Sequence, residues 1–127
     1  MYERQYTGRI RLITKPIGQD HIAKLYKDCQ VYIQPSKYES FATCILEAMA
    51  TGRPVVAPNV GGILEEIGDS GFVVNNTSEL IYRVNELLNN RVECNKIGKK
   101  ASIRVKNFEW DNIAKKTIGY YKRIMHG

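Results

Sequence analysis

The chain has 127 residues, of which 43% are hydrophobic, as expected for one globular domain with a single core. Its three cysteines form no spaced pair, and an odd number argues against a disulfide framework; Cys44 lies in an apolar run, and we expect it to be buried. No apolar stretch approaches the ~20 residues that span a bilayer and no secretory signal stands at the start, so we expect a cytoplasmic protein.

The net charge is +6, and the positive excess lies in the last third of the chain. Residues 91–123 carry ten Lys or Arg against three acidic residues, whereas residues 1–90 carry nine against ten. A solvated helix face is the first explanation. Attraction to an anionic membrane surface is the second, and it would place the protein at the inner face of the membrane. Nucleic acid is the least favoured partner, and we predict no binding to it.

Short apolar runs alternate along the chain with segments of helical spacing. The first run alternates basic and apolar residues and ends in a Pro-Gly turn, and the later runs are too short for helices and rich in Val. The predicted strands are residues 9–14, 31–33, 55–57 and 71–74. The predicted helices are residues 20–28, 41–50, 63–67 and 77–90, a segment from 92 to a break near 107, and a C-terminal helix at 108–125.

This order of elements predicts the α/β class, with a Rossmann-like parallel sheet of about four strands flanked by helices. Residues 1–127 would form a single domain. Four strands are few for a doubly wound domain, and residues 1–8 lack the strand and the tight phosphate-facing turn with which such a domain begins. We therefore expect a partial domain that lacks its first βα units.

In open parallel sheets, ligands bind beyond the carboxyl ends of the strands. The loop Pro35–Ala42 holds two hydroxyls, a lysine and a carboxylate, and it leads into a helix whose first-turn amides would attract phosphate. Glu47 is the one charged residue in that helix. A carboxylate can accept two hydrogen bonds side by side, which matches the vicinal hydroxyls of a ribose. On composition alone, a solvent-exposed Glu on a helix surface is the simpler explanation.

The spacing Glu39-x7-Glu47 stands inside a longer ordered pattern. With that pattern, the chain resembles the carboxyl-terminal domain of retaining glycosyltransferases of family 4, the glycogen-synthase and sucrose-synthase type with two Rossmann-like domains in a GT-B fold. The resemblance covers about residues 9–125. Its motifs are Leu25-Tyr26, Pro35-Ser36, Glu39-Ser40-Phe41, Leu46-Glu47-Ala48-Met49-Ala50, Gly52-Arg53-Pro54-Val55-Val56-Ala57, Val60-Gly61-Gly62, Glu65 and Gly71.

The resemblance implies that the chain is the C-terminal half-domain of a GT-B fold and binds a nucleotide-diphospho-sugar donor. Glu39 would hold hydroxyls of the donor sugar and is the candidate catalytic residue, while Glu47 would bind the ribose. Both act as binders in this interpretation, not as an acid–base pair. The other implied site residues are Ser40, Phe41, Ala42 and Thr43 beside the sugar and diphosphate, Pro16 and Ile17 beside the base, and Gly61 and Gly62 at a close backbone approach. A plain tight turn explains the two glycines equally well.

Three departures from the family pattern limit what the chain can do. Ser40 and Ala42 stand where many members have Gly, which would narrow the sugar pocket. The Arg and Lys that neutralise the leaving diphosphate have no match, since neither Arg4, Arg9 nor Arg11 has the expected context. No residues of the chain match the acceptor domain of the family, which we expect to belong to another part of the enzyme. The resemblance thus implies a hexosyl transfer with retention to a saccharide or lipid-linked acceptor held by an N-terminal domain, and we expect this part alone to be inactive.

The nucleotide-sugar would be a substrate, so no cofactor is predicted. No metal site is predicted either, because His21 and His126 lack ligand spacing. Two alternatives stay open beside the glycosyltransferase. The chain could be a non-catalytic sugar-nucleotide-binding or partner module of a split enzyme. An unrelated phosphate-binding α/β domain of the response-regulator kind is disfavoured, because it would place an acidic cluster at the strand ends.

Overall fold

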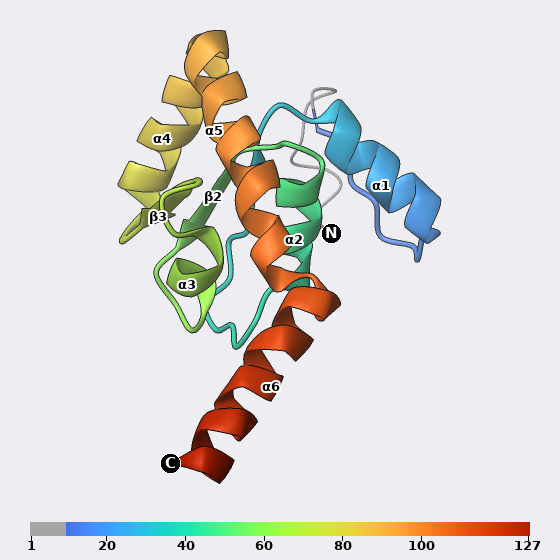
Figure 1. The fold of residues 1–127 in the computed structure, drawn as a ribbon. Helices are drawn as coiled ribbons and strands as arrows, with labels where there is room; N and C mark the ends of the chain where they lie inside the picture. Colours follow the sequence, from blue (N-terminus) through green and yellow to red (C-terminus); the bar gives the residue numbers. More distant parts are fainter. Residues whose placement is uncertain (1–9) are drawn as a thin grey trace.

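The computed structural model describes residues 10–127 and shows a small parallel sheet between helices (Figure 1). The strands β1 (Tyr32–Ile33), β2 (Val55–Pro58) and β3 (Phe72–Val74) lie in the order β1-β2-β3. Both pairings are parallel, with Tyr32 opposite Val55 and Val56 opposite Phe72. The predicted α/β class with a parallel, helix-flanked sheet is confirmed.

Helices cover both faces of the sheet because successive side chains of β2 point to opposite sides. Val55 and Ala57 pack in one core with α2, α3 and α5, whereas Val56 packs in a second core with Leu87 of α4. Val55, Val56 and Ala57 are fully buried. The helices are α1 (Gln19–Asp28), α2 (Thr43–Ala50), α3 (Ile63–Ile67), α4 (Thr77–Asn89), α5 (Arg91–Arg104) and α6 (Trp110–His126), with the 3-10 turn η2 (Val105–Phe108) between α5 and α6.

The predicted strand at residues 9–14 is wrong over its described part. Residue 9 lies outside the described residues, and residues 10–14 form no strand. Ile10, Leu12 and Ile13 are exposed, and no ladder hydrogen bond reaches them within the described chain. A strand needs a partner for its backbone groups. Within the described chain, residues 10–14 pair with neither edge strand, β1 nor β3, so the sheet has three strands instead of about four.

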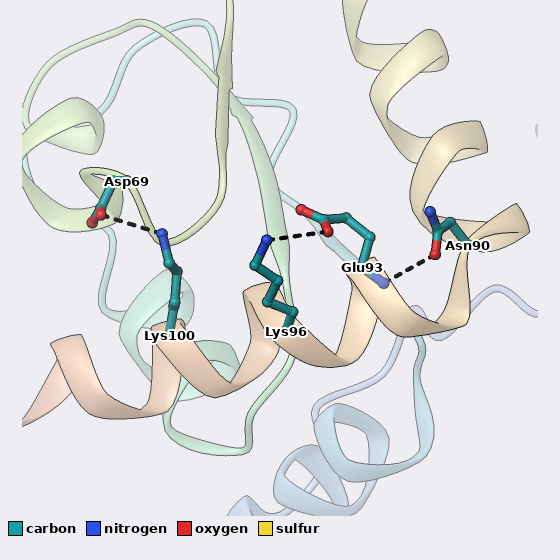
Figure 2. Close-up of polar contacts among 5 residues, drawn as sticks. All are labelled: Asp69, Asn90, Glu93, Lys96 and Lys100. Carbon is teal, nitrogen blue, oxygen red and sulfur yellow. Dashed lines mark hydrogen bonds and ion pairs between the residues drawn. The ribbon is translucent and has the colours of Figure 1, made fainter.

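Helix α5 packs closely on the end of α2. Gly98 is buried, and a Cβ built on it would overlap the carbonyl oxygen of Gly52. Two ion pairs lie on the surface of α5: Lys100 to Asp69 at 3.5 Å and Lys96 to Glu93 at 3.7 Å (Figure 2). Lys100 lowers the pKa of Asp69. Exposed pairs of this kind add little stability, so the close helix contact fixes the position of α5.

Helix α6 leaves the body of the domain and extends away from it (Figure 1). Its Trp110, Tyr121 and Ile124 side chains are exposed, with Trp110 at 83% of its full accessible surface. No helix within residues 10–127 combines the length and the apolar character that crossing a bilayer requires.

Candidate functional site

The loops that follow β1 and β2 meet at the carboxyl edge of the sheet. They enclose an open hollow of about 700 Å³. Of the predicted site residues, the structure brings Glu39 and Ser40 from the first loop together with Gly61 from the second. The full lining is Lys37, Tyr38, Glu39, Ser40, Val60 and Gly61.

Two glycines allow the second loop to lie against the backbone of the first. Gly61 has a φ of +53°, and a Cβ built on it would overlap the carbonyl oxygen of Glu39. A Cβ on Gly62 would lie 2.6 Å from the carbonyl oxygen of Ser40. Any side chain at these positions would push the two loops apart. The close approach therefore joins the two loops that form the hollow.

A chain of side-chain hydrogen bonds runs from β1 to Glu39. The Tyr32 hydroxyl donates to Gln34 Oε1, and Gln34 Nε2 donates to Ser36 Oγ at 2.8 Å. The Ser36 hydroxyl then donates to Glu39 Oε2 at 3.3 Å. Burial raises the pKa of Tyr32 to about 12, so its phenol stays protonated and able to donate. We name these residues the Tyr32–Glu39 relay. It orients one oxygen of Glu39 and leaves the other available.

Helix α2 carries the second predicted carboxylate, Glu47, on an exposed turn. Glu47 Oε2 accepts a hydrogen bond from the Tyr26 hydroxyl of α1 at 3.1 Å. Burial, and then this bond, raise the pKa of Tyr26. The two side chains line a second hollow of about 330 Å³ between α1 and α2, together with Gln19, Asp20, Ile22, Ala23, Ala50 and Thr51.

The structure thus divides the predicted site between two hollows. Glu39 lines one and Glu47 the other, and α2 runs between them. Pro16 is exposed, Ile17 is half-buried, and neither is among the residues that line these two hollows. The hollow beside Glu47 is instead bounded by Gln19 and Asp20, at the start of α1.

The amides at the start of α2 differ in what they contact. Ala42 is buried and its amide donates to Glu66 Oε1 at 2.7 Å, so it is not free for a ligand. Phe41 and Thr43 are exposed, and their amides have no protein acceptor within residues 10–127. The Phe41 ring packs beside Phe108 of η2, with ring centroids 6.1 Å apart.

Residues 3–90 match a family model described as "Glycosyl transferases group 1". The chain belongs to this glycosyltransferase family. It is 36% identical over 114 residues to an uncharacterized glycosyltransferase of Methanocaldococcus jannaschii. The alignment covers 86% of this chain and 29% of the relative. It is 30% identical over 115 residues to a sulfoquinovosyl transferase of Arabidopsis thaliana, covering 85% of the chain and 22% of that protein.

A D-inositol 3-phosphate glycosyltransferase of Streptomyces bingchenggensis is 32% identical over 116 residues, covering 88% of the chain and 26% of its own length. Among solved structures, the fold is similar to sucrose-phosphate synthase from Thermosynechococcus elongatus, a GT-B protein, with a TM-score of 0.73 and 29% identity. The match covers 87% of this chain and 29% of that one. The chain therefore spans between about a fifth and just under a third of the length of these relatives.

One buried acid was missed by the sequence-based prediction. Glu66 is 0% exposed, whereas Glu65, the residue in the family motif, is exposed. Glu66 Oε1 accepts the Ala42 amide, and Oε2 is buried without a partner in the described chain. Burial raises the pKa of Glu66. The signal was present in the sequence, because Glu66 shares the i, i+3, i+4 face of Ile63 and Ile67.

The structure corrects one expectation about a reactive side chain. Cys44 was expected to be buried and is exposed, because α2 turns Ile45, Ala48 and Met49 toward the core and Cys44 away from it. Within residues 10–127, no group of three or more His, Cys, Asp or Glu side chains could hold a metal ion.

Proposed function

We propose that this chain binds the nucleotide-sugar donor of a retaining glycosyltransferase, as the carboxyl-terminal half of a GT-B fold of the family 4 type. The observation that carries the proposal is the position of α2 between the two hollows. Unpartnered amides lie at its start beside the hollow of Glu39, and Glu47 lies farther along the helix. At ~1.5 Å per residue, the five-residue step from Ala42 to Glu47 covers ~7 Å, which is suited to a diphosphate.

Each part of the donor then has a chemically matched region. Glu47 accepts hydrogen bonds from the ribose hydroxyls, and Tyr26 holds its carboxylate in place. The free amides of Phe41 and Thr43, at the positive end of the α2 dipole, receive the diphosphate. Glu39, oriented by the Tyr32–Glu39 relay, binds hydroxyls of the sugar. Pro16 and Ile17 remain the proposed neighbours of the base.

Sugar transfer requires stabilisation of the charge that develops on the departing diphosphate, and the α2 amides supply part of it. It also requires the acceptor hydroxyl to be held at the anomeric carbon. We assign that second task to a further domain, since the chain covers less than a third of its relatives. The acceptor class we propose is a saccharide or a lipid-linked saccharide.

The donor site is tested by an NMR chemical-shift titration of the labelled chain with UDP, GDP and ADP. We expect one of them to shift amides of residues 39–47 and 15–18 with a dissociation constant of about 1 mM, or about −4 kcal/mol. Glu47→Ala removes a charged acceptor worth about 1.5–3 kcal/mol, so we expect affinity to fall about tenfold or more.

The matched control is Glu109→Ala, which removes an exposed carboxylate from a different part of the chain. We expect it to bind the same nucleotide as tightly as the unmodified chain. Equal weakening by the two substitutions would attribute the loss to net charge and contradict the ribose role of Glu47. Shifts confined to other regions would contradict the whole assignment.

We further propose that the parent enzyme works at an anionic membrane surface through α6. At 100° per residue, the exposed Trp110, Tyr121 and Ile124 fall on one face of α6, and Lys115 and Lys122 lie on the opposite side. That arrangement is typical of helices that lie in the membrane interface.

Co-sedimentation with vesicles tests this second proposal. We expect the chain to bind phosphatidylcholine vesicles only when they contain phosphatidylserine. The double change Lys115→Glu and Lys122→Glu should lower binding at least tenfold, at about 1 kcal/mol per basic residue near the surface. Lys24→Glu and Lys99→Glu together, on α1 and α5, give the matched control. Binding that does not depend on anionic lipid, or equal losses in both double variants, would contradict the proposal.

A further inference from the structure

Glu66 connects α3 to the start of α2. Its side chain is completely buried, and its Oε1 accepts the amide of Ala42, the N-cap residue of α2, at 2.7 Å. The two residues are 24 positions apart in the chain. A buried carboxylate is costly unless it is hydrogen-bonded, and this bond is the one that the Glu66 carboxylate makes within residues 10–127.

Helix α3, which carries Glu66, is held at its carboxyl end by a side chain of α5. Arg104 of α5 donates to the carbonyl oxygen of Glu66 at 2.8 Å and to that of Glu65 at 2.6 Å. Gly68, with a φ of +55°, leaves room for this guanidinium, because a Cβ there would overlap it. These bonds satisfy carbonyls that the end of α3 would otherwise leave without partners. The position of the Glu66 carboxylate is therefore fixed from α5.

The bond to Glu66 decides which amides at the start of α2 remain available. It directs the Ala42 amide into the protein, while the amides of Phe41 and Thr43 have no acceptor in the described chain. On the other side, Gly62 lies against the carbonyl oxygen of Ser40. The backbone from Ser40 to Thr43 is thus held by α3 through Glu66 and by the loop that precedes α3.

We propose that Glu66 is a positioning residue of the donor site. By binding the Ala42 amide, it holds the Ser40–Thr43 backbone so that the flanking amides face the donor's diphosphate. This inference rests on the proposed donor function. The proposed role depends on the hydrogen-bond acceptor of residue 66 and not on its negative charge, because a negative charge at this helix end would repel a diphosphate. Glutamine at position 66 should therefore preserve diphosphate binding, whereas a side chain that cannot reach the Ala42 amide should weaken it.

The test compares four variants of the full chain. Glu66→Gln keeps the acceptor without the charge, Glu66→Asp keeps the charge but draws the acceptor back, and Glu66→Met keeps most of the volume without a good acceptor. Glu65→Gln removes the same charge from the exposed neighbouring position. The measured quantities are the hydrogen-exchange rate of the Ala42 amide and the dissociation constants of a nucleoside diphosphate and its nucleoside, using whichever of UDP, GDP and ADP binds best.

We expect Glu66→Met and Glu66→Asp to weaken diphosphate binding about tenfold while nucleoside binding stays within twofold, and to speed Ala42 exchange at least tenfold. Glu66→Gln and Glu65→Gln should leave all three quantities within twofold of their values in the unmodified chain, except that diphosphate binding could become tighter. Asp, Met and Gln differ in size and polarity, so the remaining variants still test the proposal when one of them fails to fold.

Other outcomes would overturn the inference. Equal losses for nucleoside and diphosphate would make Glu66 a residue of general stability. Loss in Glu66→Gln as large as in Glu66→Met would make its charge the active feature. Failure of the donor function would look different: no nucleotide would shift any amide of the unmodified chain, while Ala42 exchange would still depend on residue 66. In that case the bond would stand and its role toward a diphosphate would be refuted.

Discussion

Replacing Gly61 by alanine is expected to destabilise the domain and remove donor binding together. The residue has a φ of +53°, which costs a non-glycine residue about 1–2 kcal/mol. The new methyl would also overlap the carbonyl oxygen of Glu39, and backbone cannot move aside as a flexible side chain can. We expect a loss of about 3 kcal/mol in the free energy of unfolding, measured by urea denaturation.

Because the clash is with Glu39 itself, the displaced loop would carry the Tyr32–Glu39 relay out of position. Nucleotide-induced shifts of residues 39–43 should then disappear. Gly18→Ala is the matched control, since Gly18 has a φ of −68° and nothing within 4 Å of a Cβ. It should change stability by less than about 0.5 kcal/mol. If Gly61→Ala were equally harmless, the two loops could not be packed as described.

Gly98→Ala is the second large effect that we expect. Alanine favours a helix over glycine by about 1 kcal/mol, so propensity alone predicts stabilisation. The methyl group would instead overlap the carbonyl oxygen of Gly52 and approach Pro54, in the turn that joins α2 to β2. Overpacking of this kind costs about 1–3 kcal/mol, and separation of α5 from α2 would add to it. We expect a net loss of about 2 kcal/mol in thermal or urea unfolding.

Gly119→Ala provides the opposite result in the same type of element. Gly119 lies inside α6, and nothing lies within 4 Å of a Cβ built there. Its replacement should raise stability by about 0.5–1 kcal/mol. Stabilisation by both substitutions would show that α5 and α2 are not in close contact. Destabilisation by both would show that α6 makes contacts that its exposure does not reveal.

The sequence predicted the three segments that pair as strands and failed for the one that does not pair within the described chain. Val55–Ala57 reads as a buried run, and the structure buries it on both sides. Residues 10–14 show an equally clear alternation, but alternation indicates only that a segment suits a sheet. Whether a neighbouring edge offers unpaired backbone groups is a property of the whole chain. Within the described chain, residues 10–14 pair with neither edge strand, β1 nor β3, and Ile10 and Leu12 stay exposed.

The candidate site was predictable where function depends on residue type and not where it depends on helix phase or side-chain direction. Glu39 and the two glycines lie at the strand ends where the pattern placed them. In α2 nearly every residue is apolar, so the pattern could not say that Cys44 faces outward. In α3 two adjacent acids look alike, and only the phase set by Ile63 and Ile67 separates Glu66 from Glu65. The Tyr32–Glu39 relay joins residues whose spacing carries no pattern.

The order of donors and acceptors beside Glu39 has a consequence for ligand choice. A carboxylate only accepts hydrogen bonds, so the Ser36 hydroxyl must donate to Glu39. Gln34 must then point its amide nitrogen toward Ser36, and the Tyr32 hydroxyl must donate to the amide oxygen of Gln34. All three hydrogen bonds of the Tyr32–Glu39 relay therefore point toward Glu39. A ligand group that meets the remaining oxygen of Glu39 has to bring its own hydrogen. A sugar with fluorine in place of that hydroxyl would match its size and still be rejected.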